Sequence, residues 1–496
     1  MNSRRWWALG ALVLSVLVIG FDTTILNVAL PTLGAAVHAS TSQLQWMVDA
    51  YVLIFAGLLL PAGALGDRYG RKPLLMIGLA LFAGGSVIGA LVHGPGQLIA
   101  VRAALGIGAA IITPISLAVL PAMFSEAERG KAIALLTMGI GVGIPLGPLV
   151  GGYLLKHYWW GSIFLINVPA AILALVAVAL LLPASRDPAG GRVDLLGGAL
   201  STVGLVAFVY GIIEAPDKGW GNDLVVGSLV LGVVLLAAFA VGQLRVAYPM
   251  IDLKLFRQPR FLMGSTAATL ASFALFGVMF VVPQYLQLVR GTDALGSGLR
   301  LLPLMAGLIV AAALGERMVA RVGSKIPVAT GMALIAAGLG WGSLTDAGTG
   351  YGTVAAWLAT IGLGTGLALA PAMDAVLGTL PPERAGSGSA LTMTMRSAGG
   401  ALGVAILGSV LAAAYTARAP GTGGSLPAAS AIAAQTHNLG ILLIGQHAYL
   451  HAMDRVLLVC AAVALAGAVL AGAFLPARGG GPAQREESDH ELARVA

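Results

Sequence analysis

The sequence predicts an all-α polytopic membrane protein with 14 transmembrane helices in a 6 + 2 + 6 order. Of its 496 residues, 58% are hydrophobic and only 10% are charged, whereas a soluble domain carries about 25% charge. The apolar residues gather into runs of about 20, the length that crosses a bilayer as a helix. Since lipid offers no partner for free backbone groups, each run predicts a helix.

The runs divide the chain into three parts and a tail. Residues 1–185 are predicted to form a six-helix bundle, with spans at 7–30, 44–65, 73–93, 96–120, 130–155 and 162–183. Residues 186–247 hold two inserted helices, at 194–214 and 223–246. Residues 248–476 form a second six-helix bundle, with spans at 261–289, 298–320, 325–345, 351–377, 386–415 and 448–475.

Both ends of the chain fit this plan. Arg4 and Arg5 precede an apolar stretch as in a signal peptide, but no small-residue cleavage site follows, so a retained first helix is expected. Connections are short except for an outer loop at 416–447, which has room for one amphipathic helix. The segment 477–496 is polar and is predicted to be a disordered cytoplasmic tail.

The basic residues predict the orientation. With the N-terminus inside, 20 of the 28 lysines and arginines fall in cytoplasmic segments and six in outer ones. This bias places both termini in the cytoplasm of a bacterial inner membrane. The net charge of +7 is therefore a sign of topology and not of a nucleic-acid partner.

The two bundles are related to each other. The loop after the second helix reads GALGDRYGRK (63–72), and the loop after the tenth reads ERMVARVGSK (316–325). Both end in Arg-x-Gly-x-Lys, between the second and third helices of their bundles. Paired halves around a midplane site are typical of transporters.

Several chemistries are not expected. Cys460 is the only cysteine, so neither an intrachain disulfide nor a thiolate metal site is predicted. The histidines fall in loops, helix edges or the tail, and the outer group of His437, His447 and His451 is read as incidental. No GxxxxGK[ST] motif is present. We expect no cofactor, no metal and no enzymatic activity, and an ion gradient as the source of energy.

Eight segments in order resemble the major facilitator superfamily, in its fourteen-helix drug:proton antiporter branch. They are FDTTILNVALP (21–31), GALGDRYGRK (63–72), LIAVRAALGIGAA (98–110), GIPLGPLVGG (143–152), WWGSIFLINVP (159–169), PMIDLKLFRQPRF (249–261), YLQLVRGTDALGSGLRLLP (285–303) and PPERAGSGSAL (381–391). WMVDAY (46–51) and WWGSIFLINVP are most similar to the quaternary-ammonium and biocide pumps of the QacA, SmvA and LfrA type. Leu105 departs from the usual glutamine of the fourth-helix motif.

The resemblance implies a major facilitator fold and a monomer that exchanges protons for lipophilic, cationic drugs and biocides by alternating access. One departure argues against dicationic cargo: LTMTMRSAGG (391–400) has an arginine and no carboxylate where some of these pumps carry acidic residues. Two alternatives keep the fold. One is export of a native metabolite, lipid or antibiotic; the other is proton-driven import, against which the Gly/Pro stripe of the fifth helix argues.

Two charged residues are candidates for proton coupling. Asp22 and Arg102 lie at similar depth in the outer third of the first bundle, by about 1.5 Å per helical residue. A charge at this depth costs at least about 2.5 kcal/mol, so it is expected to be paired or functional. The hypothesis is that Asp22 carries the exchanged proton and Arg102 tunes it; the alternative is a static ion pair that fixes packing.

The predicted substrate site combines apolar walls with few charges, as a cavity for lipophilic cations requires. Asp49 faces this cavity or sits in water at the helix mouth, and Asp374 contacts cargo or is an interfacial residue. Arg396, near the midplane, needs a partner or a polar cavity. The candidate wall residues, which could instead face lipid or serve packing, are Tyr51, Phe55, Phe276, Met279, Phe280, Gln284 and Met393.

Two segments are candidate gates. In the 63–72 loop, Gly63 and Gly70 permit close approach and a tight turn, while Asp67, Arg68 and Arg71 can form contacts that lock one conformation. The alternative is a topology signal only. In the fifth helix, Gly143, Gly147, Pro148 and Gly151 belong to a stripe of glycines spaced by four, which predicts close packing and either sliding between halves or ordinary packing.

Overall fold

The computed structural model describes residues 2–37, 39–183, 185, 194–246, 249–380 and 385–476. In these residues all regular secondary structure is helical, with short turns and loops between the helices. Thirteen helices are long and apolar enough to cross a membrane. The predicted span without a counterpart among the thirteen is the eleventh, 325–345, which coincides with the 18-residue helix α14 (Lys325–Gly342). The count of 14 is thus not confirmed by length and composition.

The N-terminal half comprises α1 to α8: α1 (Asn2–Ala36), α2 (Thr41–Tyr69), α3 (Arg71–Leu91), α4 (Pro95–Ala118), α5 (Leu120–Met123), α6 (Glu126–His157), α7 (Ser162–Leu165) and α8 (Asn167–Leu181). The insert comprises α9 (Leu195–Lys218) and α10 (Asp223–Arg245). The C-terminal half comprises η1 (Leu253–Arg257), α11 (Pro259–Gln284), η2 (Tyr285–Val289), α12 (Ala294–Arg300), α13 (Leu302–Val322), α14, α15 (Tyr351–Leu377), α16 (Ala385–Arg418), α17 (Leu426–Thr436) and α18 (Leu439–Phe474).

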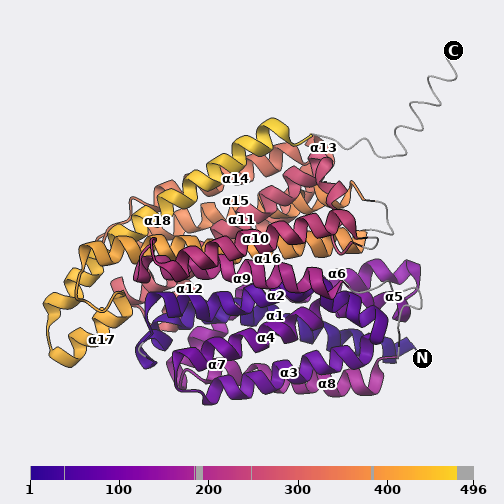
Figure 1. The fold of residues 1–496 in the computed structure, drawn as a ribbon, viewed down its shortest axis with the longest axis horizontal. Coiled ribbons are helices and arrows are strands. Elements are labelled where there is room, and N and C mark those ends of the chain that lie inside the picture. Colours follow the sequence, from indigo (N-terminus) through magenta and orange to yellow (C-terminus); the bar gives the residue numbers. More distant parts are fainter. Residues whose placement is uncertain are drawn as a thin grey trace, which may run out of the picture.

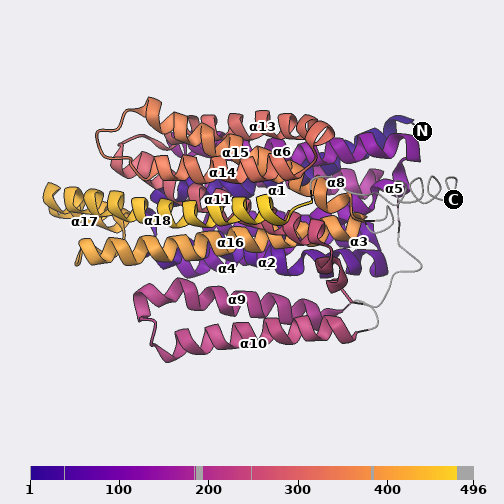
Figure 2. The same cartoon turned by 90° about the horizontal axis from the view of Figure 1, so that it is seen from above.

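The two halves repeat the same helix pairings. The N-terminal half packs α1 on α6, α2 on α4, α3 on α4 and α3 on α8. The C-terminal half packs α11 on α16, α13 on α15, α14 on α15 and α14 on α18. Figure 1 shows the halves as two layers of nearly parallel helices, and Figure 2 shows α9 and α10 as a pair at one side.

Two faces of the bundle serve as references below. The terminal face is the end where α1 begins and α18 ends, and the distal face is the opposite end, where α17 lies (Figure 1). The predicted orientation would make the terminal face cytoplasmic. The predicted tail at 477–496, and the domain boundaries next to residues 186 and 248, fall outside the described residues.

The loop predicted at 416–447 is shorter than expected. Helix α16 runs to Arg418 and α18 begins at Leu439, so the apolar segment LGILLIG (439–445) extends the last helix. The Asn438 side chain caps it by accepting a hydrogen bond from the Gly440 N–H at 3.0 Å. Between these helices lies α17, the one helix for which the loop was expected to have room.

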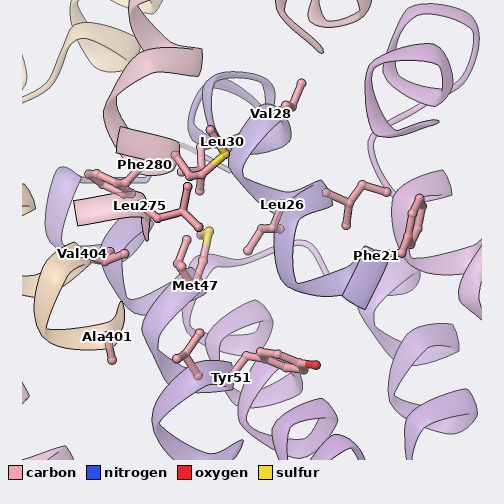
Figure 3. Packing of buried hydrophobic residues seen from close by; sticks show 14 of the residues in the cluster. Phe21, Leu26, Val28, Leu30, Met47, Tyr51, Leu275, Phe280, Ala401 and Val404 are labelled. Carbon is pink, nitrogen blue, oxygen red and sulfur yellow. The ribbon is translucent and has the colours of Figure 1, made fainter. Parts of the chain in front are cut away.

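The halves meet near the distal face. Helix α1 contacts α11, α2 contacts α16 and α6 contacts α12. In Figure 3, Leu30 and Met47 of the N-terminal half pack in one cluster with Leu275 and Phe280 of the C-terminal half. Gln45 donates hydrogen bonds to the carbonyls of Val404 (3.2 Å) and Ala405 (2.9 Å). We call this set of contacts the distal seal.

Candidate functional site

The centre of the N-terminal half holds a buried ion pair. A guanidinium nitrogen of Arg102 on α4 lies 2.6 Å from Asp22 Oδ2 on α1, and each side chain is 1% exposed. Asn167 Nδ2 donates to the other Asp22 oxygen at 2.9 Å. Both carboxylate oxygens are thus hydrogen-bonded, which a buried charge pair requires to offset its desolvation.

Arg102 is also held by α2. Its Nε donates to the Met47 carbonyl at 3.0 Å, and its guanidinium lies 4.3 Å from the centre of the Tyr51 ring. The close approach depends on Gly106, one turn along α4, where a Cβ would lie 2.7 Å from the Tyr51 carbonyl oxygen. Glycine at this position lets α4 reach α2 and delivers the guanidinium to the aromatic face.

Asp49 has surroundings that the sequence did not predict. Its side chain is fully buried, at 0% exposure, so neither an open cavity wall nor a hydrated helix mouth describes its position here. Neither carboxyl oxygen has a hydrogen-bond partner among the described residues. The sequence could not predict this burial, because it depends on α9 packing against the distal part of α2, where Trp46 donates to Glu214 Oε1 at 3.2 Å.

The predicted aromatic and methionine wall is packed against protein. Tyr51 is 1% exposed, Met279 3% and Phe280 0%, and all three belong to the main apolar cluster. Figure 3 shows Tyr51 and Phe280 in it. Tyr51 stacks in parallel with Phe55, with ring centres 6.2 Å apart. Because these side chains are buried in this conformation, contact with cargo would require the surrounding helices to move apart.

Arg396 is the membrane-embedded charge of α16 in the C-terminal half. Its Nε donates to Ser272 Oγ on α11 at 3.3 Å, which supplies the partner that the sequence could not name. The side chain is half-buried, as are its neighbours from Met393 to Ala398. No ion pair to Arg396 occurs among the described residues, so its positive charge remains uncompensated there.

The other predicted substrate residues of the C-terminal half lie apart. The Gln284 amide is buried and donates to the Phe280 carbonyl of its own helix at 2.8 Å. Phe276 is partly buried and packs in the main cluster, as does Met393. Asp374 is a correction: its side chain is 56% exposed and lies 3.8 Å from Arg260, close to the end of α15 at the terminal face. The interfacial alternative describes its position.

The glycine stripe of α6 packs on α1, as its spacing predicted. A Cβ at Gly143 would lie 2.9 Å from the Phe21 backbone nitrogen, and one at Gly147 would lie 2.8 Å from the Phe21 carbonyl oxygen. Gly151 faces Ile25 of the same helix. The Pro148 carbonyl contacts Gly298 of α12, so this end of α6 forms part of the distal seal. Whether the stripe slides stays a prediction.

The loop at 63–72 folds onto its own half. Asp67 pairs with Arg71 at 2.7 Å, four residues on, and exposed Arg68 lies over the Tyr69 ring at 5.4 Å. Gly70 adopts φ +110° and joins α2 to α3, a conformation that favours glycine. Gly63 lies where a Cβ would contact Pro114 of α4 at 3.5 Å. The loop's role in locking a conformation stays a prediction.

Two residues of the site went unassigned in the sequence. Asn167 stands within WWGSIFLINVP, and Ser272 is one of several hydroxyl residues in the apolar helix α11. An amide or hydroxyl in a membrane helix is a weak signal, because such groups also bond to their own helix. Only the tertiary contacts show that each one meets a charged side chain.

The comparisons with known proteins agree with this architecture. The family description "Major Facilitator Superfamily" matches residues 12–404. The chain is 33% identical to the tetracenomycin C resistance and export protein of Streptomyces glaucescens over 414 residues, which is 83% of this chain and 77% of that protein. It is 34% identical to the methyl viologen resistance protein SmvA of Salmonella typhimurium over 417 residues, 84% of each.

The fold has solved counterparts. A bacterial homologue of the human lysosomal transporter Spinster, in an inward-facing and occupied conformation, superposes with a TM-score of 0.69 at 17% identity, covering 95% of this chain and 97% of that one. With its paired six-helix halves and its buried charges, the chain is a multi-pass membrane transporter and not an enzyme. It belongs to the major facilitator superfamily.

Proposed function

We propose that this protein is a proton-coupled antiporter that exports lipophilic cationic drugs and biocides from the bacterial cytoplasm. The observation that carries the proposal is the ion pair of Asp22 and Arg102, buried to 1% exposure in the N-terminal half. A charge pair at membrane depth is costly to retain, and ionisable residues in transporter spans often serve ion pathways. The name of the relative SmvA, a methyl viologen resistance protein, supports a cationic cargo.

The pair suggests how proton binding would act. Protonation of Asp22 removes the negative charge that faces Arg102, and leaves the guanidinium with the Met47 carbonyl and the Tyr51 ring. A charge that loses its counterion in an apolar core favours any conformation that hydrates it. Proton uptake at Asp22 would therefore bias the N-terminal half toward a rearranged state, while Tyr51 and Phe55 move with α2.

The test uses purified protein in liposomes with an imposed pH gradient and ethidium as the cargo. Proton-coupled export predicts ethidium movement that an uncoupler abolishes, and loss of this movement in Asp22→Asn. The matched control is Asp223→Asn, which removes an exposed carboxylate at the start of α10 and should transport as the unaltered chain does. Full gradient-driven transport by Asp22→Asn would refute the role of Asp22, and uncoupler-resistant transport would refute proton coupling.

A second candidate cargo is a native metabolite or antibiotic that carries an acidic group. Arg396 favours it, because a guanidinium with one hydroxyl partner can accept a carboxylate in bidentate geometry. The name of the relative from Streptomyces glaucescens, a resistance and export protein for tetracenomycin C, is in keeping with it. Competition of ethidium transport by acidic but not by neutral aromatic compounds, lost in Arg396→Gln, would support this cargo. Equal competition by both would exclude it.

A further inference from the structure

Asp49 lies at the junction of three helices that belong to three different parts of the molecule. Gln45 and Trp46, one turn earlier on α2, face the same side as Asp49, since residues three and four apart are neighbours on a helix. Gln45 bonds to α16 of the C-terminal half, and Trp46 bonds to Glu214 of α9. Ser409 Oγ of α16 donates to the Ile212 carbonyl of α9 at 2.7 Å. We call this region the three-helix junction.

Among the described residues, no hydrogen bond compensates a negative charge on Asp49 at the junction. Both Asp49 oxygens are buried and without a hydrogen-bond partner among the described residues. An ionised carboxylate in such a place would carry the full desolvation penalty, whereas the neutral acid carries only that of a hydroxyl and a carbonyl. The closed junction therefore holds Asp49 as the neutral acid.

Each charged or titratable group on the helices packed against this part of α2 is engaged elsewhere or lies toward an end. On α4 and α1, Arg102 and Asp22 bind each other. On α9, Glu214 pairs with Lys218 at 3.1 Å. On the same helix, Tyr210 contacts Trp46 and Asp217 contacts Ser42. The remaining groups are Arg396, Tyr415 and Arg418 on α16, Arg4 and Arg5 on α1, and Arg71 and Lys72 on α3.

We propose that Asp49 is a second proton site, distinct from Asp22, and that the distal seal closes only when Asp49 is protonated. This inference rests on the proposed function, because it assigns to Asp49 the proton binding that controls the distal seal. When α2 and α16 separate at the distal face, water reaches the carboxyl group and it ionises. A proton from distal water must bind an Asp49 oxygen before the junction closes, and it returns to that water when the junction opens.

The sign of the pH dependence follows from this exchange. Closure takes up one proton, so low pH favours the closed seal and high pH the open one. Once the hydrated carboxyl is fully ionised, each further pH unit lowers the ratio of closed to open molecules by up to about tenfold. Acid on the distal side would thus favour the closed seal, so Asp49 would control when the distal face opens, while the proton that crosses the membrane is assigned to Asp22.

The experiment measures the seal directly, without cargo or gradient. Spin labels at Tyr158→Cys and Ala347→Cys, in a Cys460→Ala background, report the distance between the two halves at the distal face. Both label positions are exposed, and the protein is placed in lipid nanodiscs. We expect the distance distribution to shift from short to long as pH rises, and Asp49→Asn to remain short at every pH.

Matched variants separate this inference from the proposed function. Asp49→Glu should keep the pH-dependent shift, as should the exposed-carboxylate control Asp223→Asn.

A pH-independent distance in the otherwise unaltered chain, or a normal shift in Asp49→Asn, would overturn the role of Asp49. Should Asp49→Asn fail to insert, a pH-independent distance in the otherwise unaltered chain would still overturn the proposal. Loss of the shift in Asp22→Asn with its retention in Asp49→Asn would assign the sensor to Asp22 instead. A failed ethidium assay leaves these distances unaffected, so the two proposals fail separately.

Discussion

The two halves share a helix scaffold but differ in how they hold charge. In the N-terminal half, Asp22 and Arg102 are joined to each other, and Asn167, the Met47 carbonyl and the Tyr51 ring complete their surroundings. In the C-terminal half, Arg396 has a single hydroxyl partner. The difference shows that the same helix packing can hold different polar contacts. One half holds its arginine in a closed network with an aspartate, and the other holds its arginine with no counterion among the described residues.

The largest expected effect contrasts the halves in transport. Asp22→Asn should abolish gradient-driven ethidium movement, whereas Arg396→Gln should keep coupling and change only the apparent affinity for cargo, by about tenfold for one charged hydrogen bond. Initial rates in liposomes at several ethidium concentrations separate these effects. The comparison breaks if Arg396→Gln loses coupling while Asp22→Asn does not.

A second contrast concerns stability. Arg102→Met removes one member of a buried pair and strands the Asp22 carboxylate, which should cost about 3–5 kcal/mol. Arg396→Met removes a charge that has no counterion among the described residues, and should cost far less or nothing. Thermal unfolding of the two variants in the same detergent provides the measurement. Equal destabilisation would show that the C-terminal half holds its arginine as firmly as the N-terminal half does.

The glycine contacts should behave alike in both halves, because they belong to the repeated scaffold. Gly147 on α6 faces α1, and Gly403 on α16 faces α11, where a Cβ would lie 3.0 Å from the Phe273 Cα. Replacement of either by alanine should force the helices apart and cost about 1–3 kcal/mol. Gly141, where a Cβ meets nothing within 4 Å, is the control. A tolerated Gly403→Ala would show that the halves differ in packing as well as in charge.

The smallest effect belongs to an exposed ion pair that links the halves. Lys156 Nζ lies 2.8 Å from Asp293 Oδ2, with both side chains nearly half exposed. The hydrogen bond from Lys156, followed by that from the Gly296 backbone N–H, lowers the pKa of Asp293. Its contribution is present above the ordinary aspartate pKa and is lost as pH falls through the lowered value.

Asp293→Asn should therefore lower the free energy of unfolding at neutral pH by no more than about 1 kcal/mol, seen as a slightly lower melting temperature. In strong acid it should have no effect. Lys156→Gln should produce the same small loss at neutral pH. A large change from either variant would mean that this pair, and not the buried distal seal, holds the two halves together.

The sequence determined the helical scaffold, because lipid leaves an apolar run of about 20 residues no alternative to a helix. It also indicated that Asp22 and Arg102 lie at one depth, since rise per residue fixes depth along a helix, and that the α6 glycines form one packing face. These inferences depend on local geometry, which residue order alone sets.

Only the tertiary structure decided which charges meet. Arg102 and Asn167 both bind Asp22, Ser272 binds Arg396, and α9 binds α2 through Trp46. These contacts depend on the rotation of each helix and on the placement of the insert. For Asp374 the sequence left cargo contact and an interfacial position open, since depth near a helix end does not say whether a side chain faces the bundle or water; the exposed side chain fits the interfacial position. Hydropathy reports how deep a residue lies, but the partners of a buried charge are set by contacts between helices far apart in the chain.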